Sequence, residues 1–431
     1  MANLVHRDFE NEVASYGDVI NTRRPGSFKS FRKTTADEIT VQTRTVENVQ
    51  VPLNQHLHVS FSIQDEDASK SFQELVQIYL LPGMQGIARG VDRVICGQVH
   101  RFLGNCVGKL GGLNDSTAKD YLLETREKLN TQLAYPEGRR LVVGPAAETA
   151  LLKTEMFLSA ADRGDGGSAL REATLGRVLG FDTYMAQNMP GVYTGLDTPA
   201  AAVKNVNGAT AAGETEVVLE ATGDTPVVGE FVTIVGDMQP RYLTTNSNDV
   251  LAVLDSALKY AVNDDAIVTV YKYCDADGGY DAGYAKGIKL DGYTAGKVPQ
   301  LGQLLAFGTT LATRHTYTIV EAYENPSNAS QTIVWLDRPL DKAVADNQDA
   351  FPGPAGSFGM AFHRDAIALV TRPLALPPTA MGVQAHVASY NDVVMRVSMQ
   401  YNIVTQSTIV TLDLLAGVAL LDANLGAILL G

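Results

Sequence analysis

Apolar and polar residues alternate along residues 46–63, where the chain reads VENVQVPLNQHLHVSFSI. A period of two is typical of β-strands with one buried face. The Asn54-Gln55 break divides the stretch into two runs, so the pattern predicts a β-hairpin. An isolated two-stranded hairpin is at best marginally stable in water, so we expect this one to lie on another surface. The alternating apolar residues are Val49, Val51, Leu53, Leu57, Val59, Phe61 and Ile63.

The period then changes to that of a helix. Apolar residues recur at spacings of mostly three, four and seven, which predicts one long helix with an apolar face. The capping-box spacing Ser71-x-x-Glu74 marks its expected start. At ~1.5 Å per residue it would reach on the order of 50 Å, and Pro82-Gly83 predicts a kink or an interruption. The apolar positions are Phe72, Leu75, Val76, Tyr79, Ile87, Val91, Val94, Ile95 and Phe102.

Helix and strand patterns alternate between residues 116 and 190. A helical stripe runs through 116–134, RRLVV at 139–143 is typical of a buried strand, and Pro145 is suited to a first helical position. A further helix is expected over 168–177 and a strand over 181–187. This alternation predicts a mixed α/β body. The stripe consists of Ala118, Tyr121, Leu122, Leu129 and Leu133.

From Gly191 to Phe351 the chain turns to short β-rich runs separated by turn clusters, which predicts an all-β insert. Two segments repeat weakly inside it. TPVVGEFVTIVG at Thr225 is similar to VPQLGQLLAFG at Val298, and LDSALKYAVNDD at Leu254 to LDRPLDKAVADN at Leu336. The repeat leaves three arrangements open: two related lobes, one barrel with long loops, or two hairpins that converged on the same turn chemistry.

Three runs carry a resemblance to a known family. VPLNQHLHVSFSIQDED at 51–67 and AFHRDAIALVTRPLALPP at 361–378 resemble the phage P22 coat-protein family, and GRVLGFDTYMAQNMP at 176–190 is a looser match. The order of extended loop, long helix, mixed body and insert resembles the HK97-like capsid fold of tailed-phage major capsid proteins. The resemblance implies an α+β fold with an inserted barrel-like all-β domain.

The resemblance implies five parts. They are an N-terminal arm (1–45), an extended β-hairpin loop (46–68), a spine-helix and peripheral domain (69–115 plus 390–431), an axial domain (116–190 plus 352–389) and an acidic insertion domain (191–351). Deleting 46–63 is then expected to leave a folded subunit that cannot assemble.

The implied function is that of a structural coat protein, not an enzyme, which assembles into an icosahedral virion capsid. The implied partners are other copies in hexamers and pentamers, a scaffolding protein, a portal, packaged double-stranded DNA without specific binding, and a decoration or cement protein. Assembly is expected in the host cytoplasm.

Composition agrees with this picture and excludes others. With 431 residues, 45% of them hydrophobic, the chain can bury a sizeable core. The net charge of -14 argues against a protein whose main function is DNA binding, because binding of the phosphate backbone needs clustered Lys and Arg. Residues 191–351 hold 21 acidic and 10 basic residues, so 10 minus 21 gives -11 of that charge. The insert is therefore expected on the outside of a shell, away from DNA.

The stretch Asn21 to Lys33 is locally basic, with five basic residues and no acidic one. We expect Arg23, Arg24, Phe28 and Phe31 to contact a neighbouring subunit; the alternative is a solvated strip with the two rings pinned to the body. The start of the chain has no apolar core of signal-peptide length.

The apolar tail after residue 411 is interrupted by Asp413 and Asp422, which favours buried strands over a membrane span. Three cysteines, Cys96, Cys106 and Cys274, form no disulfide framework.

Candidate chemistry is sparse. GNCVGKL at 104–110 lacks the spacing and the hydroxyl of a phosphate-binding loop. His363-Arg364-Asp365 lacks the partners of a kinase catalytic loop, so Arg364 and Asp365 are expected in structural or intersubunit ion pairs. His56 and His58 share one strand face without a third ligand at clear spacing, and they are expected as contact residues rather than metal ligands. No catalytic, cofactor or metal site is predicted.

Two other functions remain as alternatives. An encapsulin-like cellular compartment shell would use the same fold, although such shells usually lack a large insert. An acidic β-rich enzyme or carbohydrate-binding protein would need convergent carboxylates or aromatic rings, and the single Trp335 among scattered Asp residues gives no such cluster.

Overall fold

The computed structural model describes residues 1–7, 19–23, 30–33, 35, 39, 48–158, 173, 175–191, 202–221, 225–244, 247–248, 250–293, 298–310, 313–354, 356–378, 383–390 and 393–431. These residues form two compact units. The first unit contains Met1, Val91–Arg364 and Ala423–Gly431, and the second contains Ala2–Gly90 and Asp365–Asp422. The long helix α1 (Asp65–Gly97) belongs partly to each.

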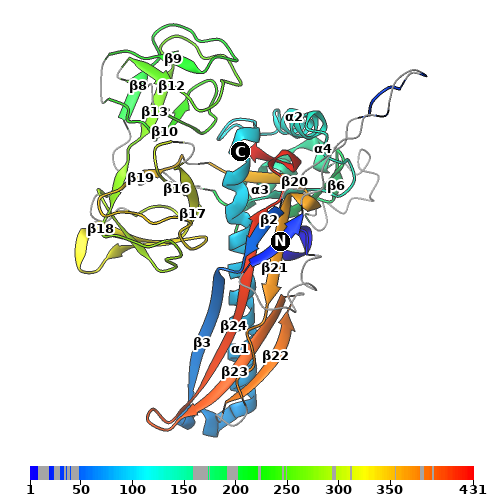
Figure 1. Ribbon diagram of the computed structural model, residues 1–431, viewed down its shortest axis with the longest axis vertical. Helices are drawn as coiled ribbons and strands as arrows, with labels where there is room; N and C mark the ends of the chain where they lie inside the picture. The colour runs from blue at the N-terminus through cyan, green and yellow to red at the C-terminus, as the bar shows by residue number, and fades with distance from the viewer. Residues whose placement is uncertain are drawn as a thin grey trace. The chain divides into compact units, whose positions relative to one another are not determined.

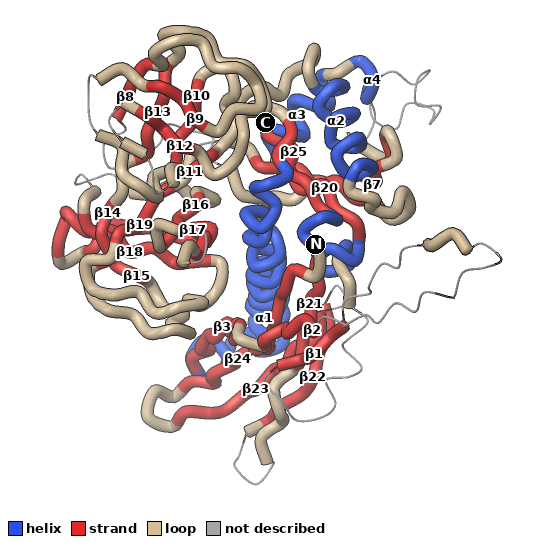
Figure 2. Tube along the Cα trace, turned by 45° about the horizontal axis from the view of Figure 1, so that its top comes forward, coloured by secondary structure: helices blue, strands red, loops and turns tan. Residues whose placement is uncertain are grey.

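The second unit is built on one long strand, β24 (Ser407–Leu420). One edge of β24 pairs with β3 (Gln55–Gln64), and the other pairs with β23 (Val393–Asn402) and then with β21 (Ile367–Arg372). β22 (Gln384–Tyr390) pairs with β23 and ends the sheet. Figures 1 and 2 show this sheet alongside the N-terminal part of α1.

The predicted alternation in β3 is confirmed, and α1 covers its apolar side. Three glycines of α1 allow the close approach. A Cβ at Gly90 would lie 3.1 Å from Leu57 Cδ1, one at Gly86 3.5 Å from Val59 Cγ2, and one at Gly83 3.2 Å from Leu412 Cδ1. Glycine inside a helix costs about 1 kcal/mol relative to alanine. Packing of the sheet against the helix backbone offsets that cost.

The predicted hairpin between 46 and 63 is wrong in its pairing. β2 (Asn48–Pro52) pairs with β1 (Val19–Arg23), whereas β3 pairs with β24 over ten residues. A two-residue reversal needs a positive φ, and neither Leu53 nor Asn54 has one, so the chain does not turn back there. Val51 of β2 is buried against Ala368 and Val370. Deleting 46–63 would remove β3 from the sheet, so this deletion does not test assembly alone.

The long helix also differs from expectation at its start. α1 begins at Asp65, directly after β3, so Ser71 lies inside the helix rather than at its cap. The helix runs through Pro82-Gly83 without ending there, although Pro82 has no N–H to donate to the preceding turn. The segment continues beyond Gly97 as the 3-10 helix η3 (Gln98–Asn105). The other 3-10 helices are η1 (Ala2–Leu4), η4 (Arg364–Ala366) and η6 (Ala423–Leu425).

The body of the first unit is a six-stranded mixed sheet in the order β4-β25-β20-β5-β7-β6. Its core includes Leu122, Leu141, Phe157 and Phe181. The strands are β4 (Cys106–Val107), β5 (Arg139–Val143), β6 (Arg177–Val178), β7 (Phe181–Met185), β20 (Phe358–His363) and β25 (Gly426–Leu430), and the helices are α2 (Ala118–Thr131), α3 (Pro145–Lys153) and α4 (Glu155–Leu158).

Two expectations in this body are corrected. The pattern places Leu133 in the helical stripe of 116–134, but α2 ends before it and its side chain is 86% exposed, at a left-handed φ of 60°. Arg177 was assigned to the end of a helix, but it lies in β6, paired with Asp182; most of 168–177 lies outside the described residues. The apolar tail forms β24 and the buried β25, as predicted. None of the described helices is both long and apolar enough to cross a membrane.

The insert is all-β, as predicted, and consists of two lobes with separate cores. The first lobe holds a four-stranded sheet, β11-β10-β13-β8, and the pair β12-β9; the second is a closed six-stranded barrel. The strands are β8 (Ala202–Asn205), β9 (Glu216–Val218), β10 (Phe231–Ile234), β11 (Arg241–Tyr242), β12 (Leu251–Val253), β13 (Ile267–Tyr271), β14 (Cys274–Ala276), β15 (Ile288–Asp291), β16 (Leu304–Phe307), β17 (His315–Asn325), β18 (Asn328–Leu336) and β19 (Asp349–Pro352).

The two lobes repeat the same strand pairing. β10 pairs with β11 and β13, and β13 with β8; correspondingly, β16 pairs with β17 and β19, and β19 with β14. The bridge Leu243–Leu254 corresponds to Ile319–Leu336.

Matching hydrogen bonds extend the repeat beyond the strands. The Gly208 N–H donates to Asp264 Oδ1 at 2.6 Å, and the Gly278 N–H donates to Asp346 Oδ1 at 2.8 Å. The residues after these carboxylates, Asp265 and Asn347, have φ values of 57° and 56°. Local turn chemistry shared by two hairpins does not account for a common pairing of six strands. The insert is therefore a tandem repeat of one module.

Candidate interaction surface

Among the described residues of the second unit, the most exposed aliphatic side chains lie at the turn between β23 and β24. Ile403 is 79% exposed and Val404 93% exposed. The Val404 N–H donates to Asn402 Oδ1 at 3.0 Å, and the Thr405 and Ser407 hydroxyls form a hydrogen bond of 2.7 Å. Local hydrogen bonds therefore hold the turn in one conformation while its two aliphatic side chains face water. We call Ile403 and Val404 the tip.

The tip is attached to the start of α1. The Asp65 N–H donates to the Gln406 carbonyl oxygen at 3.1 Å, and the Tyr401 hydroxyl donates to Asp65 Oδ2 at 2.6 Å. The hydrogen bond to Asp65 raises the pKa of Tyr401, so the phenol stays protonated near neutral pH. The tip is thus a preorganised apolar projection.

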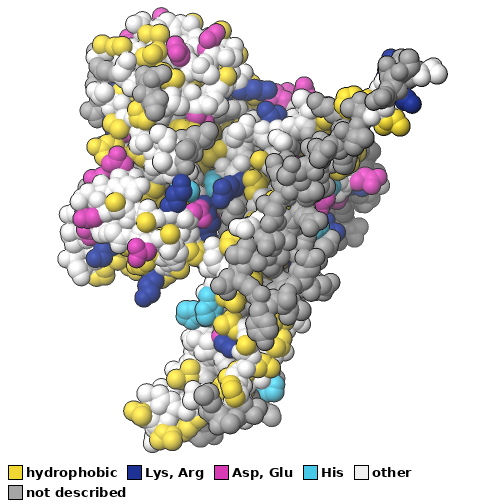
Figure 3. All heavy atoms as spheres, in the orientation of Figure 1, with side chains coloured by type: hydrophobic (Ala, Val, Ile, Leu, Met, Phe, Trp, Pro, Cys, Tyr) yellow, Lys and Arg dark blue, Asp and Glu magenta, His cyan; other side chains and the backbone are white. Residues whose placement is uncertain are grey.

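Further apolar side chains of the second unit are exposed. Ile78 and Leu81 of α1 are 58% and 49% exposed, and Val387 of β22 is 49% exposed. Figure 3 shows hydrophobic side chains at the end of this unit that carries the β23–β24 turn. Single exposed apolar residues are common on protein surfaces, so the adjacent Ile403 and Val404 are the more informative candidates for a contact surface.

The sequence did not single out the tip. The alternation of apolar and polar residues over 393–403 predicts a strand that includes Ile403, but β23 ends at Asn402. The available signal was Asn402 itself, because Asn caps turns through its side chain.

The structure places His56 and His58 side by side on the polar face of β3. Both are exposed, and their ring centroids are 6.2 Å apart. Asp413 lies opposite His58 in the register, but its carboxylate is engaged by Arg396 through two hydrogen bonds of 2.9 and 2.6 Å. Among the residues that the structure describes, no group of three His, Cys, Asp or Glu side chains is arranged to hold a metal.

The remaining predicted contact residues are dispersed. Arg23 ends β1 opposite Asn48, and Phe31 is 57% exposed, whereas Arg24 and Phe28 lie outside the described residues. Their expected contact with a neighbouring subunit stays a prediction.

Arg364 and Asp365 lie in η4. Asp365 Oδ1 is 2.9 Å from His6 Nδ1, so this carboxylate has a partner within the second unit. The expectation of an intersubunit role for Arg364 and Asp365 also stays a prediction.

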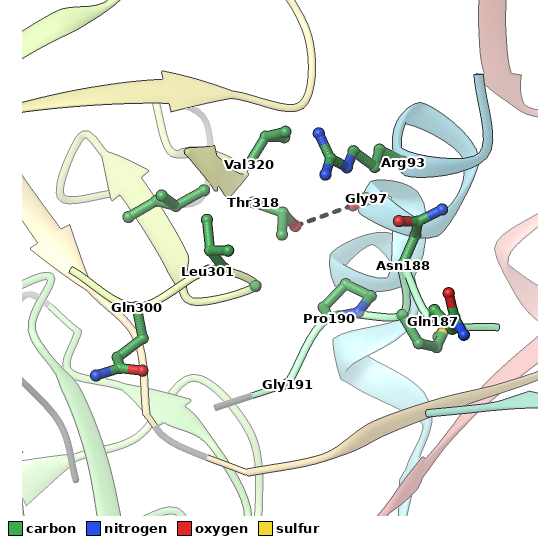
Figure 4. A pocket seen from close by; sticks show the side chains of 13 residues that line it. Arg93, Gly97, Gln187, Asn188, Pro190, Gly191, Gln300, Leu301, Thr318 and Val320 are labelled. Carbon is green, nitrogen blue, oxygen red and sulfur yellow. Dashed lines mark hydrogen bonds between the residues drawn. The ribbon is translucent and has the colours of Figure 1, made fainter. Parts of the chain in front are cut away.

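The first unit contains a pocket of about 360 Å³ between the end of α1 and the second lobe. Figure 4 shows Arg93 and Gly97 of α1 facing Thr318 and Val320, with the Thr318 hydroxyl donating to the Gly97 carbonyl oxygen at 3.5 Å. Arg93 is the one charged side chain of its lining. The lining offers no acid and base pair for proton transfer.

A buried ionic cluster lies beside this pocket. The Asp337 side chain is fully buried, and its carboxylate accepts hydrogen bonds from the Thr318 N–H at 2.7 Å and Arg338 Nη1 at 3.1 Å. Arg338 also donates to Asp341 Oδ2 at 2.8 Å and lies over the ring of Tyr317. Burial raises the pKa of Asp337. Each charge in the cluster has an opposite partner within the lobe. The cluster is therefore part of the lobe's own structure and not a ligand-binding site.

The three cysteines are free thiols. Burial raises the pKa of Cys96 and of Cys106 to about 12, so neither forms an appreciable amount of thiolate near neutral pH. They do not constitute a reactive site.

Comparisons with known proteins give structural matches only. No family model matches the chain, and no curated protein does. One similar structure is titled "Mycobacterium phage Che8", with 13% identity, a TM-score of 0.42, and coverage of 99% of this chain and 89% of that one.

Two further structures are titled as capsids. "Capsid structure of the Cyanophage P-SCSP1u" has 10% identity, a TM-score of 0.44, and coverage of 96% of this chain and 84% of that chain. "Asymmetric unit of bacteriophage PhiM1 mature capsid" has 10% identity, a TM-score of 0.36, and coverage of 96% and 81%. The three matches extend over nearly the whole length of this chain.

Proposed function

We propose that this chain is the major capsid protein of a tailed double-stranded DNA phage, with an HK97-like fold that carries a duplicated β insert. The observation that carries the proposal is the second unit. A ten-residue strand leads without a loop into a 33-residue helix, and the sheet ends in the exposed tip. This arrangement fits a protein whose task is contact between copies.

The physics of shell assembly supports this reading. Interfaces depend on a few apolar anchors held in place before binding, and the tip has this character. Each contact between copies can be weak, because closure of the shell joins many contacts in one particle. A stable capsid therefore does not require a strong interface between any two copies.

The proposed organisation keeps the five parts expected from the sequence, with 1–45 as the arm and 191–351 as the insert. The proposed loop of 46–68 is divided between two pairings, since β2 pairs with β1 of the arm and β3 pairs with β24. The acidic insert would face away from packaged DNA because like charges repel.

We propose copies in hexamers and pentamers as the principal partners. A scaffolding protein, a portal, enclosed DNA without specific binding, and a decoration or cement protein follow from the capsid assignment. The proposed role is structural rather than enzymatic, in a virion assembled in the host cytoplasm. No observation on the described residues favours an encapsulin-like compartment.

Electron microscopy of the chain expressed alone and together with its scaffold tests the proposal. Closed icosahedral particles are the expected result, and a stable monomer under both conditions would contradict it. Replacing both tip residues, Ile403→Asp with Val404→Asp, should abolish particles without changing the melting temperature of the subunit, because both side chains already face water. The matched control is Leu133→Asp, which changes an 86% exposed leucine in the first unit.

A further inference from the structure

The four-stranded sheet of the first lobe has an inner and an outer face. Val232 and Ile234 of β10 and Val268 and Val270 of β13 lie in the core of the lobe. Because side chains alternate along a strand, the residues between them belong to the outer face. Directly paired residues share a face, so the register Val203–Thr269 adds Val203. The registers Ile267–Asn205 and Phe231–Tyr242 likewise add Asn205 and Tyr242. The outer face therefore comprises Val203, Asn205, Phe231, Thr233, Val235, Tyr242, Ile267, Thr269 and Tyr271.

One end of this outer face is already an interface. Phe231 and Tyr271 pack against Phe351 and Ala306 of the second lobe. The Arg314 guanidinium lies 4.5 Å from the centroid of the Phe231 ring and donates to the Gly229 carbonyl oxygen at 2.7 Å. A barrel of the same module thus covers the sheet at this end.

The other end of the outer face is open and carries three exposed aliphatic side chains beside the half-buried Asn205 and Thr269. Val203 is 58% exposed, Val235 48% and Ile267 47%. The Val235 N–H donates to the Ile267 carbonyl oxygen at 2.8 Å, which makes these two residues neighbours. Figure 3 shows hydrophobic side chains on the surface of the lobe that carries β8 to β13. We call Val203, Val235 and Ile267 the distal patch.

The second lobe serves as an internal reference for the distal patch. Ile267 pairs with Asn205 at the start of β13, and its counterpart Asp349 pairs with Asp275 at the start of β19. The repeated module therefore folds with a charged residue at this position. The aliphatic side chain of Ile267 is not required by the fold of the module, and its exposure calls for another explanation.

We propose that the distal patch binds a second copy of this chain, so that inserts of neighbouring subunits contact each other. The inference rests on the proposed capsid function and deepens it. The patch is continuous with the face on which one barrel already packs, so another barrel fits the same surface. Each insert carries a net charge of -11, from 21 acidic and 10 basic residues, so a contact between two inserts needs an uncharged centre to limit repulsion.

The size of the patch fixes the strength of the contact. Stable isolated interfaces bury about 1,200 Å² or more in total, which three aliphatic side chains do not approach. The contact is therefore weak between two free subunits and becomes effective only where a shell repeats it. Its loss should appear in the assembly reaction and not in the oligomeric state of dilute subunits.

The test compares two substitutions at equally exposed positions of the first lobe. Ile267→Asp installs the residue type found at the corresponding position of the second lobe. The control, Val218→Lys, also installs the residue found at the corresponding position of the second lobe, Lys289, but on a different sheet of the first lobe. Val218 is 47% exposed, as is Ile267. Ile267→Asp should raise the subunit concentration needed for particle formation by about tenfold, which corresponds to ~1.4 kcal/mol. Val218→Lys should leave it unchanged, and both subunits should melt like the wild type.

A cross-link identifies the occupant directly. Ile267→Cys and Val218→Cys, each labelled with a benzophenone maleimide, are irradiated in particles and in unassembled subunits. Covalent dimers of this chain from position 267, in particles only, are expected. Adducts to another protein, no adduct, or equal yields from both positions would overturn the inference.

The two proposals fail differently. Particles that form normally with Ile267→Asp refute the insert contact and leave the capsid function intact. A wild-type chain that forms no particles with its scaffold refutes the capsid function, and the contact with it.

Discussion

Gly97, the last residue of α1, permits the second lobe to pack against that end of the helix. A Cβ added there would lie 2.6 Å from Asp337 Oδ2 and 2.8 Å from Asp337 Cβ and Cγ. Real Cβ atoms do not approach other heavy atoms so closely. In Gly97→Ala either the carboxylate or the helix end must move, although the Asp337 carboxylate is held by Thr318 and Arg338.

The magnitude follows from three contributions. Overpacking a buried site costs roughly 1–3 kcal/mol, and we take the middle of that range, about 2 kcal/mol. Weakening the hydrogen bonds of a buried carboxylate adds roughly 1–3 kcal/mol. The higher helix propensity of alanine returns at most about 1 kcal/mol. We therefore expect Gly97→Ala to lower the free energy of unfolding of the first unit by about 2–4 kcal/mol.

Urea unfolding of the unassembled subunit, followed by the fluorescence of the single Trp335 in β18, measures this difference. The matched control is Gly104→Ala in η3, where an added Cβ meets nothing within 4 Å. That control should be neutral or slightly stabilising. The reasoning is refuted if Gly97→Ala is as stable as Gly104→Ala.

Two further predictions concern buried charges. Burial raises the pKa of Glu230, so the folded state holds its proton more tightly than the unfolded state, and its contribution to stability is lost as pH rises through the folded pKa. The equivalent residue of the second lobe is Gln303, so we use Glu230→Gln. As pH rises from about 4 to 7, this variant should become more stable than the wild type by on the order of 1 kcal/mol. Thermal melting of both proteins across that pH range measures the difference. Arg396→Ala leaves the buried Asp413 carboxylate without its bidentate partner, which should cost about 3–5 kcal/mol in the second unit. Hydrogen exchange of β23 and β24 would check this, and unchanged protection would contradict it.

The sequence predicted the elements whose pattern is local. The alternation of Leu57, Val59, Phe61 and Ile63 predicted β3, and the apolar tail predicted buried strands, because side chains on a strand repeat every two residues whatever the strand pairs with. The weak internal repeat at Leu254 and Leu336 also came from the chain alone, because duplicated turns keep their Asp, Asn and Gly residues.

Other features depended on residues far apart in the chain. β3 pairs with β24 rather than with β2, although more than 300 residues separate β3 from β24. An alternation of apolar and polar residues indicates that a strand has one buried face, but it does not indicate which strand pairs with it. The predicted hairpin failed for this reason.

Exposure was likewise decided by the tertiary structure. Leu133 and Ile403 fit the apolar periods of their neighbours, yet they are 86% and 79% exposed, because α2 and β23 end just before them. The distal patch became visible only when two repeated lobes could be compared position by position. The sequence by itself determined the strands, the long helix and the acidic insert, since these follow from local periodicity and composition. Only the tertiary structure decided which strands pair and which aliphatic side chains remain at the surface, because both depend on where each element ends and what packs against it.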